Sequence, residues 1–242
     1  MAKIYVPVKD VLGHPGVTSG IIRALSLATA SESGRIWPLF HIVAAILDAR
    51  PQYIRDIVGS DFLKIVATYS KQPSPEYDLD CVILTVRRFY GHAADAALIT
   101  PDLEVDFANA AVGLTKRPNA KPMPIALMIG HLTTDPNSVL TTMLFERLED
   151  IPALYARAIA FPGSQETNIP AAFTNLLHLT ALSKEGAFPN AIGDLDMQCT
   201  NAIATLDGWG QIRDILATAD EERLPVLFCA IVRVCLATSI FS

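Results

Sequence analysis

Proline and glycine divide this sequence into short apolar segments, and this division most limits the folds open to the chain. Within the segments the apolar residues recur at the spacing of one helical face. Phe62, Ile65, Val66 and Tyr69 show the pattern at i, i+3, i+4 and i+7. Alternation of apolar and polar residues, which indicates strands, is found mainly in residues 3–8. The sequence therefore predicts an all-α protein with an extended N-terminal arm.

The composition excludes several classes of protein. Hydrophobic residues make up 51% of the chain and charged residues 18%, so burial of apolar surface can offset the entropy lost on ordering the backbone. Four cysteines in 242 residues are too few for a disulfide scaffold, and we expect reduced thiols. The net charge of -6 argues against a protein that coats nucleic acid by bulk electrostatics, but it leaves a local basic groove open.

Capping and helix-breaking residues predict where the helices begin and end. Thr18 or Ser19 can cap the first helix, Thr100 precedes a proline and an acid as at a helix start, and Gly91 marks an end. The predicted helices cover residues 21–30, 39–49, 51–59, 61–70, 78–91, 101–114, 125–132, 138–149, 152–160, 170–184, 194–206, 211–217 and 224–241.

Residues 116–124 form the clearest linker, because they hold three prolines and three basic residues. We therefore predict an N-terminal helical lobe at 1–115 and a C-terminal helical lobe at 125–242. Residues 1–125 carry 13 basic and 12 acidic side chains, whereas residues 126–242 carry 6 and 13. This asymmetry fits head-to-tail self-association or a basic groove on one side, and it also fits acids that simply solvate the second lobe.

The two ends of the sequence bear on localisation. Residues 1–8 lack the charged and apolar regions of a secretory signal, so we expect a cytoplasmic protein. Residues 224–241 form an 18-residue apolar run interrupted by Arg233. An arginine at the middle disfavours a spanning helix, so the run predicts a buried helix. A membrane segment and a surface that packs on a neighbouring copy are the alternatives.

Sequence motifs for catalysis and metal binding are absent. The chain has no phosphate-binding loop, no dinucleotide fingerprint, no nucleophile elbow and no zinc-protease helix. Its five histidines are scattered singly, so we expect no metal and no cofactor. His92 and Asp95 lie one helical turn apart and could orient a general base, although such pairs are common on helix surfaces.

A cluster of basic and aromatic residues predicts contacts with single-stranded RNA. Guanidinium and ammonium groups neutralise phosphates, and flat aromatic rings stack on bases. An arginine near the end of a helix also complements the helix dipole, so a purely structural role is the alternative. The predicted RNA-binding residues are Arg87, Arg88, Phe89, Tyr90, Lys116, Arg117 and Lys121.

Two short pieces of the second half carry a resemblance to a known class of protein. They are the stretch from Tyr155-Ala156-Arg157 through Phe161-Pro162-Gly163, and Phe188-Pro189-Asn190. Both are similar to the aromatic and proline pattern of nucleoproteins from negative-strand RNA viruses. With its two predicted lobes, arm and basic linker, the chain resembles a viral nucleoprotein or helical capsid subunit. The resemblance implies a self-assembling coat protein that packages single-stranded RNA between its lobes, with the arm or the apolar tail docking on neighbouring copies.

Two other functions stay open at this point. A small helical enzyme would assemble its site from dispersed residues such as His92, Asp95 and His178. A matrix-type interaction module would use the apolar run at 224–241 to bind a partner helix or a membrane surface.

Overall fold

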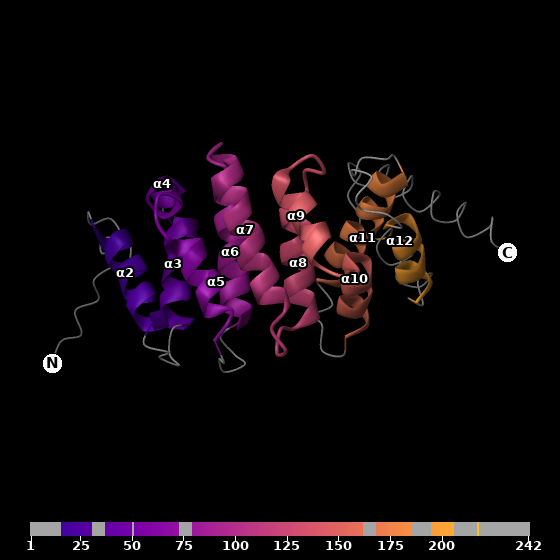
Figure 1. Ribbon diagram of the computed structural model, residues 1–242, viewed down its shortest axis with the longest axis horizontal. Coiled ribbons are helices and arrows are strands. Elements are labelled where there is room, and N and C mark those ends of the chain that lie inside the picture. The colour runs from indigo at the N-terminus through magenta and orange to yellow at the C-terminus, as the bar shows by residue number, and fades with distance from the viewer. Residues whose placement is uncertain are drawn as a thin grey trace. The chain divides into compact units, whose positions relative to one another are not determined.

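A computed structural model describes residues 16–30, 37–49, 51–72, 79–161, 168–184, 195–205 and 217. Within these ranges it contains eleven α-helices, one short 3-10 helix and no strand, which confirms the all-α prediction (Figure 1). Contacts within the chain divide it into two units, residues 1–120 and 121–242. The predicted arm and the apolar run at 224–241 lie outside the described residues, and the arrangement as two lobes stays a prediction.

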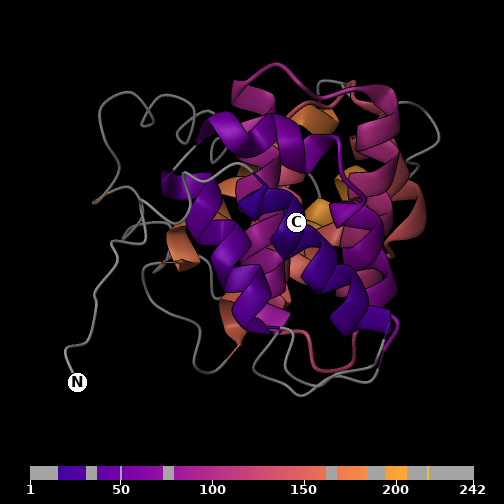
Figure 2. The same cartoon turned by 90° about the vertical axis from the view of Figure 1, so that its left-hand side faces the viewer.

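The first unit is built from six α-helices and the 3-10 helix in its described part. Helix α3 packs along α6, α5 packs on α7, and α2 contacts α3, α4 and α5. These helices are coloured indigo to magenta in Figure 1, and Figure 2 shows them after a turn of 90°. Their bounds are α2 Val17–Ala30, α3 Trp37–Ala49, η1 Pro51–Tyr53, α4 Ile54–Val58, α5 Phe62–Tyr69, α6 Leu79–Asp95 and α7 Pro101–Thr115.

Aromatic rings join four of these helices in the core of the first unit. The ring centroids of Phe40 and Phe62 lie 6.1 Å apart, those of Phe62 and Phe89 lie 5.5 Å apart, and those of Phe89 and Phe107 lie 5.1 Å apart. Each such pair contributes about 0.5–1.5 kcal/mol beyond the burial of its surface. The rings therefore hold α3, α5, α6 and α7 together.

The second unit is arranged around α10 in its described part. Helix α10 packs against α8, α11 and α12, and its Tyr155 is among the largest fully buried side chains. The helix is apolar on most of its circumference, as expected for a helix surrounded by others. The bounds are α8 Pro122–Leu132, α9 Val139–Arg147, α10 Ile151–Ala160, α11 Ile169–Lys184 and α12 Leu195–Ala204.

The predicted cap at Thr100 is confirmed, and Ser138 is a second cap that the sequence analysis does not predict. The Thr100 side chain accepts a hydrogen bond from the Leu103 amide at 3.3 Å, and Ser138 Oγ accepts one from the Thr141 amide at 3.0 Å. Each bond satisfies an amide that has no partner inside the helix.

The structure corrects other predicted bounds. Helix α2 begins at Val17, so Thr18 and Ser19 lie inside it and do not cap it. Helix α6 continues through Gly91 to Asp95. An internal glycine costs about 1 kcal/mol in a helix. Burial of Tyr90 and Ala93 on either side of Gly91 offsets that cost.

Helix starts in the second unit also differ from the predictions. Helix α8 begins at Pro122, so residues 122–124 of the predicted linker form its first turn, where proline is tolerated. Asp150 has a φ of 45° and its Oδ1 accepts a hydrogen bond from the Ala153 amide at 2.8 Å. This cap starts α10 one residue before the predicted Pro152.

None of the helices in the described ranges combines the length and the hydropathy that crossing a membrane requires.

Candidate functional site

The two aromatic residues of the predicted RNA-binding cluster belong to the core. Phe89 is 1% exposed and Tyr90 is 7% exposed. Both rings pack on Phe107, with centroid distances of 5.1 Å and 5.2 Å. Because both rings are covered by the protein, the structure does not offer them to a nucleic-acid base. Their neighbours in the sequence, Arg87 and Arg88, are partly exposed.

Arg88 is already engaged by a carboxylate. Its Nη1 forms an ion pair with Oδ2 of Asp48 on α3, and Nε2 of His92 lies 3.8 Å from the other carboxylate oxygen of Asp48. Arg87, by contrast, forms no ion pair with any residue of the described part of the chain. Of the two adjacent arginines, Arg87 therefore keeps its charge available for a ligand.

The residues of the alternative catalytic hypothesis belong to different units, His92 and Asp95 to the first and His178 to the second. His92 faces Asp48, and no hydrogen bond joins it to Asp95 within the described residues. His178 lies on α11 in the second unit, where with Tyr155 and Asn175 it lines a cavity of about 10 Å³. Burial raises the pKa of the Tyr155 hydroxyl and a hydrogen bond with Thr133 opposes that rise, so the buried phenol stays protonated.

The predicted basic residues around the end of α7 lie in different surroundings. Lys116 is exposed and is the C-cap residue of α7, where a cation complements the helix dipole. Arg117 is partly buried, and its Nε has no hydrogen-bond partner. Lys121 is exposed at the N-cap of α8 and belongs to the second unit.

A groove that sequence reasoning did not find lies beside α2 in the first unit. It has a volume of about 1000 Å³, and its walls come from α2, the η1–α4 segment and the connection to α5. Nine of its thirteen lining residues have polar side chains: two arginines, two aspartates and five residues with hydroxyl groups. These are Arg23, Arg55, Asp56, Asp61, Thr18, Ser19, Ser26, Tyr53 and Ser60.

One wall of this groove is a stripe of α2. Ser19, Arg23 and Ser26 follow one another at i, i+4 and i+7, which places them on one face of the helix. Thr18 and Ile22 lie beside this stripe and are buried. Tyr53, Arg55 and Asp56 come from η1 and α4 and line the same groove. The groove therefore joins segments that are about thirty residues apart in the sequence.

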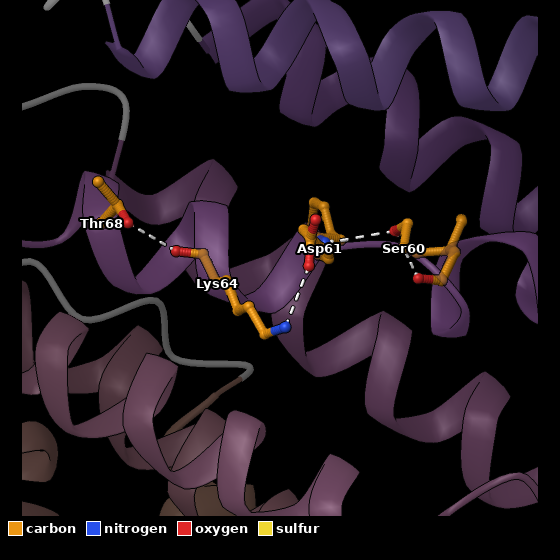
Figure 3. Close-up of polar contacts among 6 residues, drawn as sticks. Ser60, Asp61, Lys64 and Thr68 are labelled. Carbon is orange, nitrogen blue, oxygen red and sulfur yellow. Dashed lines mark hydrogen bonds and ion pairs between the residues drawn. The ribbon is translucent and has the colours of Figure 1, made fainter.

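Several polar groups at the edge of the groove are already used by the fold. Nζ of Lys64 lies 3.1 Å from Oδ1 of Asp61, and this hydrogen bond raises the pKa of Lys64 (Figure 3). Ser60 Oγ donates to the Ile57 carbonyl at 2.6 Å and accepts from the Phe62 amide at 3.3 Å. Thr68, also drawn in Figure 3, donates its hydroxyl to the Lys64 carbonyl at 2.8 Å.

The two arginines of the groove differ from these groups, because their side chains remain available to a ligand. Arg23 and Arg55 are exposed, and neither forms an ion pair or side-chain hydrogen bond with the residues that the structure describes. Two guanidinium groups without carboxylate partners favour an anionic ligand, for which planar fork-shaped donors are well suited. The spacing of Ser19, Arg23 and Ser26 was visible in the sequence, but nothing local indicated that α4 packs beside it.

The described residues contain no group of three or more histidine, cysteine, aspartate or glutamate side chains placed to hold a metal ion. Cys81 and Cys199 are buried free thiols. Comparison with protein families, with curated proteins and with solved structures finds no match to this chain.

Proposed function

We propose that the chain is a structural subunit that binds single-stranded RNA through cationic side chains of its first unit, as the resemblance to viral nucleoproteins implies. One observation carries the proposal. Arg23, Arg55, Arg87 and Lys116 form no ion pair with other described residues, whereas Lys64 and Arg88 are held by Asp61 and Asp48. Cations without carboxylate partners can contact phosphates at no cost of breaking an existing pair.

The proposal agrees with the charge distribution of the chain. The acidic side chains outnumber the basic ones beyond residue 125, while the first 125 residues are nearly balanced. A ligand of high negative charge is therefore repelled less by the first unit than by the second. Self-assembly into a homo-oligomer is kept in the proposal on the sequence resemblance alone.

The purified full-length protein tests the proposal directly. Size exclusion with light scattering, together with the ratio of absorbance at 260 and 280 nm, is measured before and after nuclease and high salt. We expect large particles that carry nuclease-sensitive RNA. A monomer that is free of nucleic acid and does not bind a labelled single-stranded oligoribonucleotide overturns the proposal.

Substitution then tests which cations take part. In Arg87→Gln and Lys116→Gln, each lost phosphate contact should lower the slope of log affinity against log salt by about 0.7. Arg157→Gln is the matched control, because Arg157 is an exposed arginine of the second unit. Equal slopes for all variants and the unsubstituted protein contradict the assignment of Arg87 and Lys116.

A further inference from the structure

We infer that the groove beside α2 binds the phosphodiester backbone of single-stranded RNA, with Arg23 and Arg55 as its phosphate-binding side chains. This inference rests on the proposed function and names the surface that performs it. Arg23 comes from α2 and Arg55 from α4, so a strand lying in the groove meets a guanidinium group from each of two helices. Neither guanidinium group has to break an ion pair with a described carboxylate before it binds a phosphate.

Thr18 supplies an independent observation that points to a polar ligand. It lines the groove, is 6% exposed, and its hydroxyl has no hydrogen-bond partner among the described residues. The residue is largely buried, but its hydroxyl is not among the fully buried side-chain atoms, so it can donate to a ligand that enters the groove. A phosphate oxygen in the groove would accept a hydrogen bond from this hydroxyl. Ser19 cannot supply the same donor, since its Oγ donates to the Gly16 carbonyl at 3.0 Å.

Tyr53 gives the groove the aromatic side chain that Phe89 and Tyr90 do not supply. It is partly exposed, lines the groove, and lies two residues before Arg55. A strand without sequence preference is held by cations on its phosphates and by aromatic rings against its bases, at about 1–3 kcal/mol for each stacked base. The groove contains both kinds of side chain on the η1–α4 wall.

The volume of the groove fits this ligand. At about 1000 Å³ it lies at the upper end of the range of about 300–1,000 Å³ found for small-molecule pockets. The stripe from Ser19 to Ser26 extends about 10 Å along α2, since each helical residue advances about 1.5 Å. A single nucleotide occupies part of such a length, and a strand can pass along all of it.

The two carboxylates of the groove should affect phosphate binding in the opposite direction to its arginines, and the experiment can measure this difference. Asp61 is paired with Lys64, so its charge is partly compensated. Asp56 lies next to Arg55 in the sequence, lines the groove, and pairs with no cation of the described residues. A phosphate bound there is repelled by Asp56, and Asp56→Asn should therefore strengthen binding.

The experiment measures the affinity of the full-length protein for a fluorescein-labelled oligouridylate of about 12 nucleotides by fluorescence anisotropy at several salt concentrations. We expect the double variant Arg23→Gln/Arg55→Gln to bind on the order of tenfold more weakly, with a salt slope smaller by about 1.4. We expect Asp56→Asn to bind more tightly and Arg157→Gln to match the unsubstituted protein. Circular dichroism confirms that each variant is folded.

Failure of the inference is distinguishable from failure of the proposed function. If the unsubstituted protein does not bind the oligonucleotide, the proposed function fails and the inference with it. If binding is lost in Arg87→Gln/Lys116→Gln but unchanged within a factor of about two in Arg23→Gln/Arg55→Gln, the groove is excluded while the proposed function stands. If adenosine triphosphate binds in an Arg23-dependent and Arg55-dependent way and the oligonucleotide does not, the groove takes a free nucleotide and the RNA assignment is overturned.

Discussion

Arg88 on α6 forms an ion pair with Asp48 on α3, across a sequence separation of 40 residues. His92, one helical turn further along α6, approaches the same carboxylate at 3.8 Å. Asp48 therefore holds two basic side chains of α6 against α3. The contact removes Arg88 from the cations that a ligand can use. It also links two helices whose rings, Phe40 and Phe89, both pack on Phe62 of α5.

Asp48→Asn separates these two roles of the ion pair. Since both side chains are partly exposed, we expect a loss of only about 0.5–1 kcal/mol in the free energy of unfolding. The released Arg88 becomes available to phosphates, so RNA affinity should rise. Urea denaturation measures the first quantity and fluorescence anisotropy the second. Weaker RNA binding by folded Asp48→Asn would contradict the role given to the unpaired cations.

Gly113 lets α7 approach α5 closely. A Cβ atom at Gly113 would lie 2.1 Å from Ser70 Oγ and 3.0 Å from Ser70 Cβ. The hydroxyl can rotate but the Cβ is fixed to the backbone, so Gly113→Ala should destabilise the first unit by about 1–3 kcal/mol. Ser70→Gly removes both atoms, and the double variant should recover part of the loss. Strictly additive free energies of unfolding in this double-mutant cycle would show that the two positions do not touch.

Gly130 has the same role between α8, α10 and α11. A Cβ atom there would lie 2.7 Å from Asn175 Cγ and 3.0 Å from the Tyr155 hydroxyl oxygen. We expect Gly130→Ala to lower the midpoint of thermal unfolding, because α8 or the Asn175 side chain must move.

Gly20 provides the matched control for this substitution. It also lies in a helix, but a Cβ atom there would have no neighbour within 4 Å. Gly20→Ala should therefore stabilise the protein by up to about 1 kcal/mol through helix propensity. A Gly130→Ala variant as stable as Gly20→Ala would refute the close approach.

Tyr155 should make the stability of the second unit depend on alkaline pH. Burial raises its pKa above the ordinary value of 10.0, so the fold favours the protonated phenol. The stabilisation is complete below pH 10 and is lost as the pH rises from there toward the higher folded-state value, by about 1.4 kcal/mol per pH unit.

The measurement compares urea denaturation of the unsubstituted protein and of Tyr155→Phe at about pH 9 and about pH 11. The phenylalanine variant loses the hydrogen bond with Thr133 but has no phenol to ionise. Its free energy of unfolding should therefore decrease less over this interval. The same decrease in both proteins would show that Tyr155 ionises as readily in the fold as in the unfolded chain.

Local signals in the sequence predict much of the helical structure. Thr100 followed by a proline and an acid marks the start of α7, and the apolar spacing from Phe62 to Tyr69 marks α5, because both signals act within one or two helical turns. Gly91 predicts a helix end, but α6 continues through it because Tyr90 and Ala93 on either side are buried within the folded unit. Helix propensity is weaker than such burial.

The candidate site was less predictable than the fold. Phe89 and Tyr90 lie beside two arginines in the sequence, and this adjacency favoured a nucleic-acid interpretation over the core position that their spacing along α6 also allowed. Successive helical residues point in directions about 100° apart, so neighbours in sequence need not share a surface. The groove beside α2 depends on contacts between α2 and α4, which no local pattern encodes.

The aromatic contacts that link Phe40, Phe62, Phe89 and Phe107 also bear on how the chain acquires its structure during synthesis. The final ring of the series is in α7, so the earlier helices leave the ribosome before the partner that covers Phe89 and Tyr90 exists. Apolar surface is exposed during that interval, and contacts between distant segments form slowly. Chains interrupted before α7 would therefore present uncovered rings to chaperones and proteases. The rings of the first unit become covered only after Phe107 has left the ribosome.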